Sequence, residues 1–374
     1  MKNKLNLLEP TLVINEDICR QNLQRMTERA KRHKVLFRPH FKTHQSIEIG
    51  EWFRDAGVTA ITVSSIKMAT FFAEHGWEDI TVAIPVNSLE KDRINRLAKN
   101  IELNLLTADY EGTILLDSVL KYPVGLWIKI DIGYNRTGIH FADSILIDSI
   151  LDIIKRSPNL TFRGFLTHAG QSYNCRSNAE IIEVHQQSVS KMKSVSEKYK
   201  SIYPDHKISV GDTPTCSIEN DFGLVDEIRP GNFIFYDLMQ AQISACGKDE
   251  IAIAMACPVV ARHAERLEII FIGGGIHFSK DYILDAKGQK RFGDLVMINE
   301  NGWSEVVDGC YVSKLSQEHG TLKVTPDVFK NIHAGDIVGI LPVHSCMTAN
   351  LMGGYTTLSS KKLDYFDIRK EYYI

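Results

Sequence analysis

The first two thirds of the chain alternate short apolar runs with segments whose apolar residues recur at helical spacing. Between residues 17 and 34, Ile18, Leu23 and Met26 recur near that spacing among charged residues, and residues 35–37 then form a short apolar run. This order predicts a helix followed by a strand. Seven further strand-like runs follow, at residues 58–65, 80–86, 101–107, 124–131, 162–168, 207–210 and 225–229. Helix-compatible or loop segments separate most of them.

Eight strands alternating with helices over about 200 residues are what a (β/α)8 barrel requires. An open, doubly wound sheet is the alternative that the same alternation allows, and the pattern favours the barrel over it. We therefore predict an α/β fold with a TIM-type (β/α)8 barrel over residues 15–240.

Beyond Asp237 the apolar runs are shorter and turns separate them. They lie at residues 251–256, 267–272, 295–298, 309–312, 321–324 and 337–341. This pattern predicts a C-terminal β domain over residues 241–374. Residues 1–14 are a candidate addition to this domain, because a strand is expected at residues 11–14 and could pair with it. Three glycines at 273–275 resemble a phosphate loop, but no helix or lysine pattern follows, so we expect a tight turn between strands.

Composition narrows the classes of partner. Lys and Arg number 43 against 46 Asp and Glu, and no block of like charge is long enough to bind nucleic acid or a membrane surface. The first residues lack the apolar stretch of a signal peptide, and no later run reaches membrane-spanning length, so we expect a cytosolic protein. The seven cysteines are an odd number without a paired framework, which argues against a disulfide scaffold.

The densest chemical signal is the sequence R-P-H-F-K-T-H at residues 38–44, directly after the first predicted strand. Active sites of such barrels lie at the carboxyl ends of the strands, so Lys42 is expected at the mouth of the barrel. A lysine reacts with a carbonyl compound only as the neutral amine, and partial burial or the neighbouring cations would favour that form. A basic loop at the barrel rim has the same spacing, so the spacing alone does not identify a cofactor.

This stretch resembles the cofactor-lysine motif of the D-threonine aldolase and D-serine dehydratase family, whose barrel is of the alanine racemase type. The resemblance implies that Lys42 binds pyridoxal 5'-phosphate. It continues in order along most of the chain. The family's D-x-G-x-x-R-x-G segment matches residues 131–138, which implies that Arg136 lies near the phenolic oxygen of the cofactor. Its T-H segment matches residues 167–168, which implies that His168 packs against the pyridine ring.

Two further segments match the cofactor site of the family. Residues 209–215 follow the seventh strand, where these barrels bind phosphate through small residues and backbone N–H groups, so Ser209, Gly211 and Thr213 are expected to contact the phosphate. Asp212 is not, because an anionic side chain beside a phosphate is unfavourable. The segment at 227–237 resembles the R-P-G segment that closes the barrel, and Tyr236 is a candidate cofactor contact or simply a wall of the site.

In the second domain, His344 and Cys346 follow an apolar run, so an extended chain would place both on one side. Imidazole and thiolate are good zinc ligands, but two ligands are too few to predict a metal unaided. The family resemblance makes a divalent metal the better interpretation. Some aldolases of the family carry aspartate at the position of Cys346, and a thiolate favours zinc over manganese.

Pyridoxal phosphate accepts electrons from the substrate Cα, and a metal can act on a β-hydroxyl, so the resemblance implies a lyase for a D-3-hydroxy amino acid. In a dehydration of the D-serine or 3-hydroxyaspartate type, Lys42 removes the Cα proton. In a retro-aldol cleavage of the D-threonine aldolase type, His40, His44 or His319 would be the base. Cys346 favours dehydration. An amino-acid racemase and a non-catalytic pyridoxal phosphate carrier remain alternatives, and the resemblance also implies a homodimer.

Overall fold

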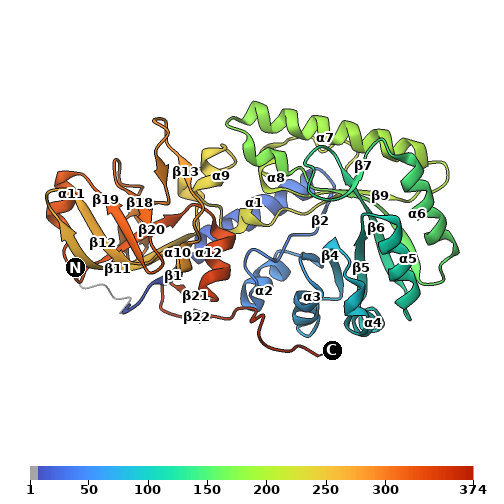
Figure 1. Cartoon of the computed structure of the whole chain (residues 1–374), viewed down its shortest axis with the longest axis horizontal. Helices are drawn as coiled ribbons and strands as arrows, with labels where there is room; N and C mark the ends of the chain where they lie inside the picture. Colours follow the sequence, from blue (N-terminus) through green and yellow to red (C-terminus); the bar gives the residue numbers. More distant parts are fainter. Residues whose placement is uncertain (1–6, 374) are drawn as a thin grey trace. The chain divides into compact units, whose positions relative to one another are not determined.

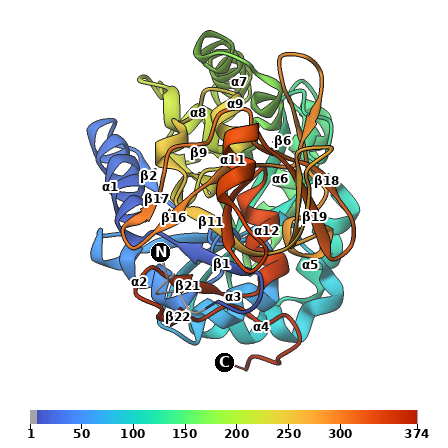
Figure 2. The same cartoon turned by 90° about the vertical axis from the view of Figure 1, so that its left-hand side faces the viewer.

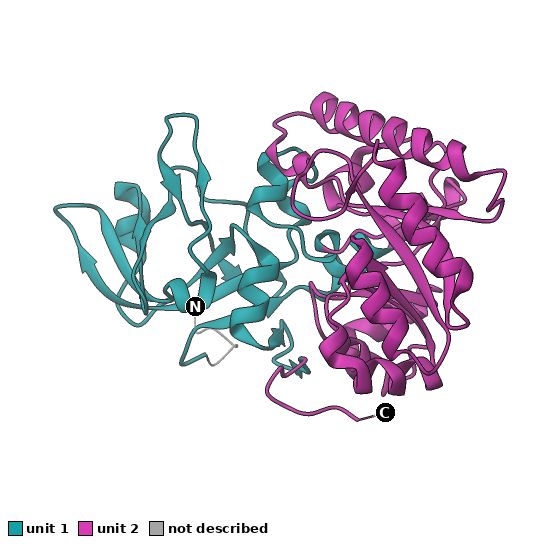
Figure 3. Cartoon of the chain, turned by 45° about the vertical axis from the view of Figure 1, so that its right-hand side comes forward, with its two compact units in different colours: residues 1–23, 232–365 teal, residues 24–231, 366–374 magenta. Residues whose placement is uncertain are grey.

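The computed structural model describes residues 7–373 and divides the chain into two compact units (Figure 3). The barrel unit comprises residues 24–231 with the C-terminal stretch from residue 366, and the β unit comprises residues 232–365 with the N-terminal stretch to residue 23. The division falls after Gly231, whereas the sequence placed it at 240. The C-terminal stretch belongs with the barrel unit because Phe366 N donates to Gln45 O at 2.7 Å and its ring packs 5.3 Å from Phe71.

The barrel unit contains the predicted closed sheet of eight parallel strands (Figure 1). Their order around the sheet is β2-β10-β9-β8-β6-β5-β4-β3, and a parallel bridge between His40 and Thr62 brings the chain after β2 against β3 and so completes the ring. The short strand β7 (Ile139–His140) pairs with β6 outside this path. The eight strands are β2 (Leu36–Phe37), β3 (Ala60–Val63), β4 (Asp79–Pro85), β5 (Glu102–Thr107), β6 (Val124–Asp131), β8 (Leu160–Thr167), β9 (Lys207–Val210) and β10 (Glu227–Ile228).

Helices follow most of the strands, and their first residues explain where they begin. In α2, α3, α5, α6, α7 and α8 a serine or aspartate side chain accepts a hydrogen bond from a backbone N–H of the first turn, as N-caps do. The helices are α1 (Glu16–Arg32), α2 (Ile47–Asp55), α3 (Ile66–Ala73), α4 (Lys91–Asn100), α5 (Tyr110–Val119), α6 (Ser144–Arg156), α7 (Asn178–Tyr199) and α8 (Thr213–Ile218). No helix among residues 7–373 is long and apolar enough to cross a membrane.

The second unit is a β domain, as the sequence predicted, and the structure shows that it is built on an antiparallel barrel. Strands β12-β19-β18-β15-β20-β11 follow one another, and a further pairing of β11 with β12 closes them. The N-terminal strand β1 pairs with the start of β11 and runs parallel to β21, so β1, β21 and β22 continue the sheet at one side (Figure 2). The bounds are β1 (Thr11–Ile14), β11 (Ile253–His263), β12 (Glu268–Ile272), β15 (Gly293–Val296), β18 (Tyr311–Leu315), β19 (His319–Lys323), β20 (Ile337–Pro342), β21 (Tyr355–Thr357) and β22 (Lys362–Leu363).

Short helices and hairpins complete the β unit. The glycine run at residues 273–275, which leads into one of these helices, corrects a prediction. Gly273 N donates to Glu318 O and Gly275 N to Ser316 O, so the glycine run prolongs the pairing of β12 with β19. The chain then enters α10, and the predicted tight turn between strands is therefore wrong. The remaining elements include α9 (Leu238–Gln242), α10 (Gly275–Phe278), α11 (Pro326–Asn331), α12 (Ser345–Met352), and the hairpins β13–β14 (Ile283–Leu284, Lys290–Arg291) and β16–β17 (Ile298–Asn299, Gly302–Trp303).

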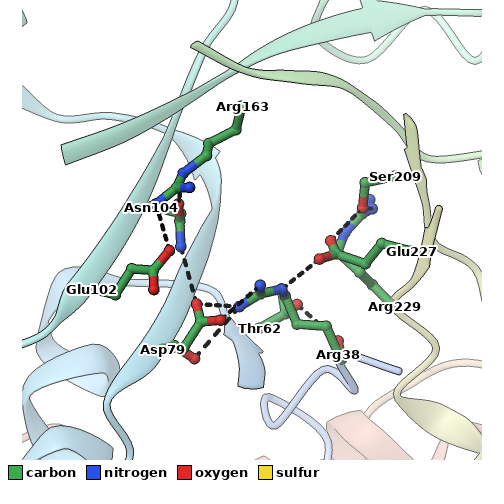
Figure 4. Close-up of polar contacts among 9 residues, drawn as sticks. All are labelled: Arg38, Thr62, Asp79, Glu102, Asn104, Arg163, Ser209, Glu227 and Arg229. Carbon is green, nitrogen blue, oxygen red and sulfur yellow. Dashed lines mark hydrogen bonds and ion pairs between the residues drawn. The ribbon is translucent and has the colours of Figure 1, made fainter. Parts of the chain in front are cut away.

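A chain of polar side chains crosses the interior of the barrel unit (Figure 4). The buried Arg38 donates to Glu227 Oε2 at 2.6 Å and to the two carboxylate oxygens of Asp79 at 2.5 and 3.0 Å. Asp79 also accepts from Asn104 Nδ2 at 3.1 Å, and Asn104 Oδ1 accepts from Arg163 Nε at 3.0 Å. Because Arg38 has a carboxylate on either side, its charge is compensated although its side chain is out of water.

Arg38→Leu should lower the free energy of unfolding by about 3–5 kcal/mol, because it leaves the buried Glu227 and the partly buried Asp79 without their cation. Urea denaturation followed by circular dichroism measures the change. The matched control is Arg156→Leu, whose guanidinium pairs with Asp152 at 3.6 Å while 80% of its side chain is exposed. That variant should stay within about 0.5 kcal/mol of the wild type. Equal effects of the two substitutions would contradict a central role for Arg38.

Candidate active site

Lys42 lies in the loop after β2, at the carboxyl end of the barrel strands. Phe41 anchors this loop: it is fully buried, and its ring packs 4.9 Å from Phe53 and 5.0 Å from both Phe72 and Trp77. The adjacent Lys42 is exposed. The aromatic anchor therefore holds the backbone of the loop while the amine of Lys42 remains accessible at the barrel mouth, as the sequence predicted for this strand end.

Two of the predicted histidines lie in the same electrostatic environment as Lys42. Burial lowers the pKa of His40 well below its usual value, and the charges of Lys42 and Arg229 lower it further. Burial also lowers the pKa of His168 to about 3, although its hydrogen bond with Gly211 O opposes the shift. Both rings are therefore neutral at physiological pH, and the contact with Gly211 fixes the orientation of His168.

Arg136 follows β6 and completes one wall of a small pocket. Its guanidinium lies over the ring of Tyr134 at 5.1 Å, and Tyr134 meets the ring of His168 edge-on at 5.7 Å. Asp131 Oδ1 accepts from the backbone N–H groups of Gly133 and Asn135, so this carboxylate ties its own loop. The pocket is lined by Lys129, Ile130, Asp131, Tyr134, Arg136, Thr137 and His168.

Lys129 is a further candidate for the site, which the sequence did not single out. It lies on β6, is only 5% exposed, and lines the same pocket as Arg136 and His168. Burial lowers its pKa to about 8, and the charges of Arg136 and Arg229 act in the same direction. The sequence does contain a signal for this residue, because Lys129 is a single lysine within an otherwise apolar strand. Burying a charged group there costs free energy unless it is paired, and such positions are often functional.

Arg229, the arginine of the R-P-G segment, received no role from the sequence, yet it is the buried centre of a hydrogen-bond network. Its Nη1 donates to Ser209 Oγ at 2.5 Å and its Nη2 to Thr167 O at 2.7 Å. Ser209 Oγ in turn donates to Glu227 Oε1 at 2.5 Å, which joins Arg229 to the polar chain of Arg38 (Figure 4). Burial lowers the pKa of Arg229 to about 10, although the negative charge of Glu227 acts to raise it.

The predicted phosphate segment follows β9. The hydroxyl of Ser209 has the two partners just described, and the carbonyl of Gly211 holds His168. Asp212 caps α8 by accepting from Thr215 N at 2.8 Å, from Thr215 Oγ1 at 2.7 Å and from Ser172 Oγ at 3.0 Å. Its carboxylate is thus committed to this cap. Phosphate contacts from Ser209, Gly211 and the buried Thr213 stay predictions, and for Ser209 the hydroxyl would have to give up a partner.

The structure does not bring His44 to the barrel mouth. Its ring is fully buried, stacks on Phe53 at 5.3 Å and meets Phe41 edge-on at 4.4 Å. Its Nδ1 accepts from Ser46 N at 3.1 Å, at the start of α2. Burial lowers the pKa of His44 to about 3. These contacts describe a ring that supports the aromatic anchor of the loop.

In the β unit, His344 and Cys346 lie at the start of α12. His344 is the N-cap residue and Cys346 the second residue of the helix, so the predicted extended chain is wrong at this point; the beginning of the helix brings the two side chains together. Burial opposes protonation of His344, but Cys346, Asp237 and Asp281 together raise its pKa to about 9. Among residues 7–373, no three His, Cys, Asp or Glu residues converge as a metal site.

Carboxylates and an amide surround this pair. Asp237 Oδ2 accepts from Ser345 N at 2.9 Å and from Asn232 Nδ2 at 2.8 Å, and the same amide lies 3.5 Å from Cys346 Sγ. The first turn of α12 is thereby fixed by a fully buried aspartate. A thiol and an imidazole held side by side next to carboxylates match the donor preferences of zinc.

The other two predicted residues of this unit lie elsewhere in its fold. His319 is the first residue of β19 and is exposed, with its backbone carbonyl accepting from Ser316 N at 2.9 Å. Tyr236 is buried, with a left-handed backbone at φ 48°. Left-handed backbone is uncommon for a bulky residue and often marks a functional or tightly constrained position. The roles assigned to both residues stay predictions.

Two family models match the chain, one in each part. The alanine racemase N-terminal domain matches residues 14–238, and a putative serine dehydratase domain matches residues 252–358. The chain is 29% identical to D-serine dehydratase of Dictyostelium discoideum, over 95% of this chain and 94% of that protein. It is 27% identical to D-threo-3-hydroxyaspartate dehydratase of Delftia sp. (strain HT23), over 95% of each.

The fold agrees with that of a solved structure over almost the whole of both chains. The structure of D-threo-3-hydroxyaspartate dehydratase from Delftia sp. HT23 superposes with a TM-score of 0.89 at 24% identity, covering 98% of this chain and 99% of that one. The first family model alone spans more than half of the sequence. With its barrel and its second, antiparallel β domain, the chain belongs to the family that joins an alanine racemase N-terminal domain to a serine dehydratase domain.

Proposed function

We propose that this protein is a lyase that uses pyridoxal 5'-phosphate and a divalent metal, preferably zinc, to dehydrate a D-3-hydroxy amino acid such as D-serine or 3-hydroxyaspartate. The observation that carries the proposal is the convergence of basic groups from several strand ends at the barrel mouth. Lys42, Arg136 and Arg229 supply positive charge there, beside the neutral rings of His40 and His168. The names of the relatives support the same reaction class.

The residues at the barrel mouth fit an anionic aromatic cofactor. Pyridoxal phosphate carries negative charge on its phosphate and phenolic oxygen, which the arginines and Lys129 would compensate. Lys42 would hold the cofactor covalently, and the oriented ring of His168 would support its pyridine face. When bound, the cofactor would withdraw electrons from the substrate Cα.

Side chains of the protein would accept and donate the protons of the reaction. The amine of Lys42 is the group that would remove the Cα proton, and the exposed position of Lys42 suits a side chain that must reach different atoms in turn. The neutral His40 in the same loop is a second candidate base, although its Nδ1 accepts a hydrogen bond from the backbone N–H of Lys42 at 3.4 Å and would have to give up that bond to take a proton there. His44, packed inside the aromatic anchor, receives no role in this proposal.

His344 and Cys346 would hold the metal, which would act as a Lewis acid towards the β-hydroxyl of the substrate. The presence of a thiolate ligand favours zinc over manganese and supports dehydration as the reaction. A solved structure of a D-threo-3-hydroxyaspartate dehydratase with a cysteine-to-alanine substitution is in the metal-free form, which agrees with a metal-binding cysteine in that enzyme.

Retro-aldol cleavage is the second candidate reaction, because the low pKa of His40 leaves a neutral imidazole that can accept the proton of a hydroxyl. A racemase or a non-catalytic carrier would have no use for the metal pair. The expected partners are thus a small amino-acid substrate and, from the family resemblance, a second copy of the chain.

Borohydride reduction of the holoprotein should place the phosphopyridoxyl group on Lys42, because this amine is accessible at the strand end among the cationic groups. Peptide mapping by mass spectrometry reads the position. Lys42→Ala should lose the visible absorbance of the bound cofactor together with at least about 10³-fold of turnover. Detection of the phosphopyridoxyl group on Lys129 or any other lysine would refute Lys42 as the residue that binds the cofactor.

Removing the metal should abolish lyase activity and leave cofactor binding intact. Because a Lewis acid contributes several kcal/mol, Cys346→Ala or chelation should reduce turnover roughly 10²-fold or more. Exchange of the substrate Cα proton with deuterium, followed by NMR, should partly survive because it needs only Lys42 and the cofactor. Cys246→Ala, another half-buried cysteine of the β unit, is the control and should keep its activity. Full activity in protein shown to contain no metal would refute this role.

Incubation with D-serine, D-threonine and D-3-hydroxyaspartate distinguishes the reactions. A dehydratase should release a 2-oxo acid and ammonia from D-serine or D-3-hydroxyaspartate, whereas an aldolase should release glycine and an aldehyde. Chromatography on a chiral phase detects any L-isomer. Glycine as the main product would show that the reaction is aldol cleavage and not dehydration. Racemisation without either product would exclude both lyase reactions.

A further inference from the structure

One carboxylate in the β unit contacts the ring of His344 directly. Asp281 Oδ2 lies 2.9 Å from His344 Nδ1, although the two residues are 63 positions apart. Asp281 reaches the imidazole from the loop after α10, whereas His344 precedes α12. A contact between such distant segments at hydrogen-bond distance requires that both be held in place.

The loop holds Asp281 by a local hydrogen-bonded turn. Ser279 Oγ donates to Asp281 Oδ2 at 3.0 Å and lies 3.2 Å from Asp281 N, which donates to it. Ser279 itself has φ 69°, a left-handed conformation that is unfavourable for a residue with a Cβ atom. The chain thus adopts a strained backbone at the position that directs the carboxylate towards His344.

A second contact fixes the two segments to each other. Thr348 Oγ1, in the first turns of α12, lies 3.3 Å from Phe278 O and 3.1 Å from His344 O. Phe278 ends α10 and is buried, with its ring 6.3 Å from Phe271. The hydroxyl of Thr348 therefore joins the end of α10 to the residue that precedes α12, so the distance between Asp281 and His344 is set by the fold.

We propose that Asp281 is a positioning residue for the metal ligand His344. By accepting the hydrogen of Nδ1, the carboxylate selects the tautomer whose Nε2 carries the lone pair, and it fixes the plane of the ring. The negative charge also makes the imidazole a stronger donor to a cation. This inference rests on the proposed metal site of His344 and Cys346.

The position of Asp281 distinguishes this role from that of a third ligand. Its carboxylate contacts the ring nitrogen itself, and within the described part of the chain it does not form a three-residue metal group with His344 and Cys346. Water and substrate oxygen would then complete the coordination, which keeps positions open for chemistry.

Zinc affinity of the holoprotein tests the proposal, measured by competition with a chromophoric chelator at fixed pH. Asp281→Ala should raise the dissociation constant for zinc by about 10–100-fold, as loss of such a carboxylate usually does. Asp281→Asn should fall between this variant and the wild type, because its amide oxygen still accepts a hydrogen bond but carries no charge. Asp327→Ala, which removes a 91% exposed carboxylate from the same unit, should leave the affinity unchanged.

Cobalt substitution supplies a readout that a general loss of structure would not reproduce. In Asp281→Ala, the ligand-field bands of bound Co²⁺ should shift because the imidazole is no longer oriented, while the charge-transfer band from the thiolate of Cys346 should persist. Loss of both bands together with loss of the cofactor absorbance would indicate unfolding and would overturn a specific role for Asp281.

Cys346→Ala separates this inference from the proposed function. If Cys346→Ala binds zinc as well as the wild type does, the metal site itself is refuted, and the role of Asp281 with it. If Cys346→Ala loses zinc but Asp281→Ala retains wild-type affinity and an unchanged cobalt spectrum, only the assignment of Asp281 is overturned.

Discussion

Arg38 is buried between Glu227 and Asp79, and the polar interior of the barrel unit depends on these two ion pairs. A guanidinium out of water is tolerated only with its charge compensated, and here the compensation comes from β4 and β10. Glu227 also accepts from Ser209, which accepts from Arg229. Arg38 is thus linked through Glu227 and Ser209 to Arg229, and the position of Arg229 in turn influences the electrostatic environment at the strand ends.

The barrel mouth combines positive charge with neutral imidazoles. This combination is physically consistent because burial and nearby cations both disfavour protonation of His40 and His168. Positive charge therefore stays on the lysine and arginine side chains, which can compensate an anionic ligand, while the imidazoles remain available as a ring face or a proton acceptor. The low pKa of Lys129 follows from the same environment.

The β unit achieves its arrangement differently, through the beginning of a helix. The buried Asp237 fixes the first turn of α12, and this turn places His344 and Cys346 side by side. Preorganisation of this kind matters for metal sites, because ligands that are already oriented lose less conformational freedom on binding. The strained turn at Ser279 shows that backbone conformation, too, is adjusted near these residues.

The sequence by itself determined the eight barrel strands, the second β domain and the position of Lys42, because runs of apolar residues and the residues that follow them are local features. It did not determine the start of α12, the aromatic surroundings of His44 or the boundary after Gly231. Only the tertiary structure decided that Lys129 and Arg229 share the environment of Lys42, and that Asp281 contacts His344. These residues are far apart along the chain, and the burial and charge that define their roles arise only when the strands and loops that carry them pack together.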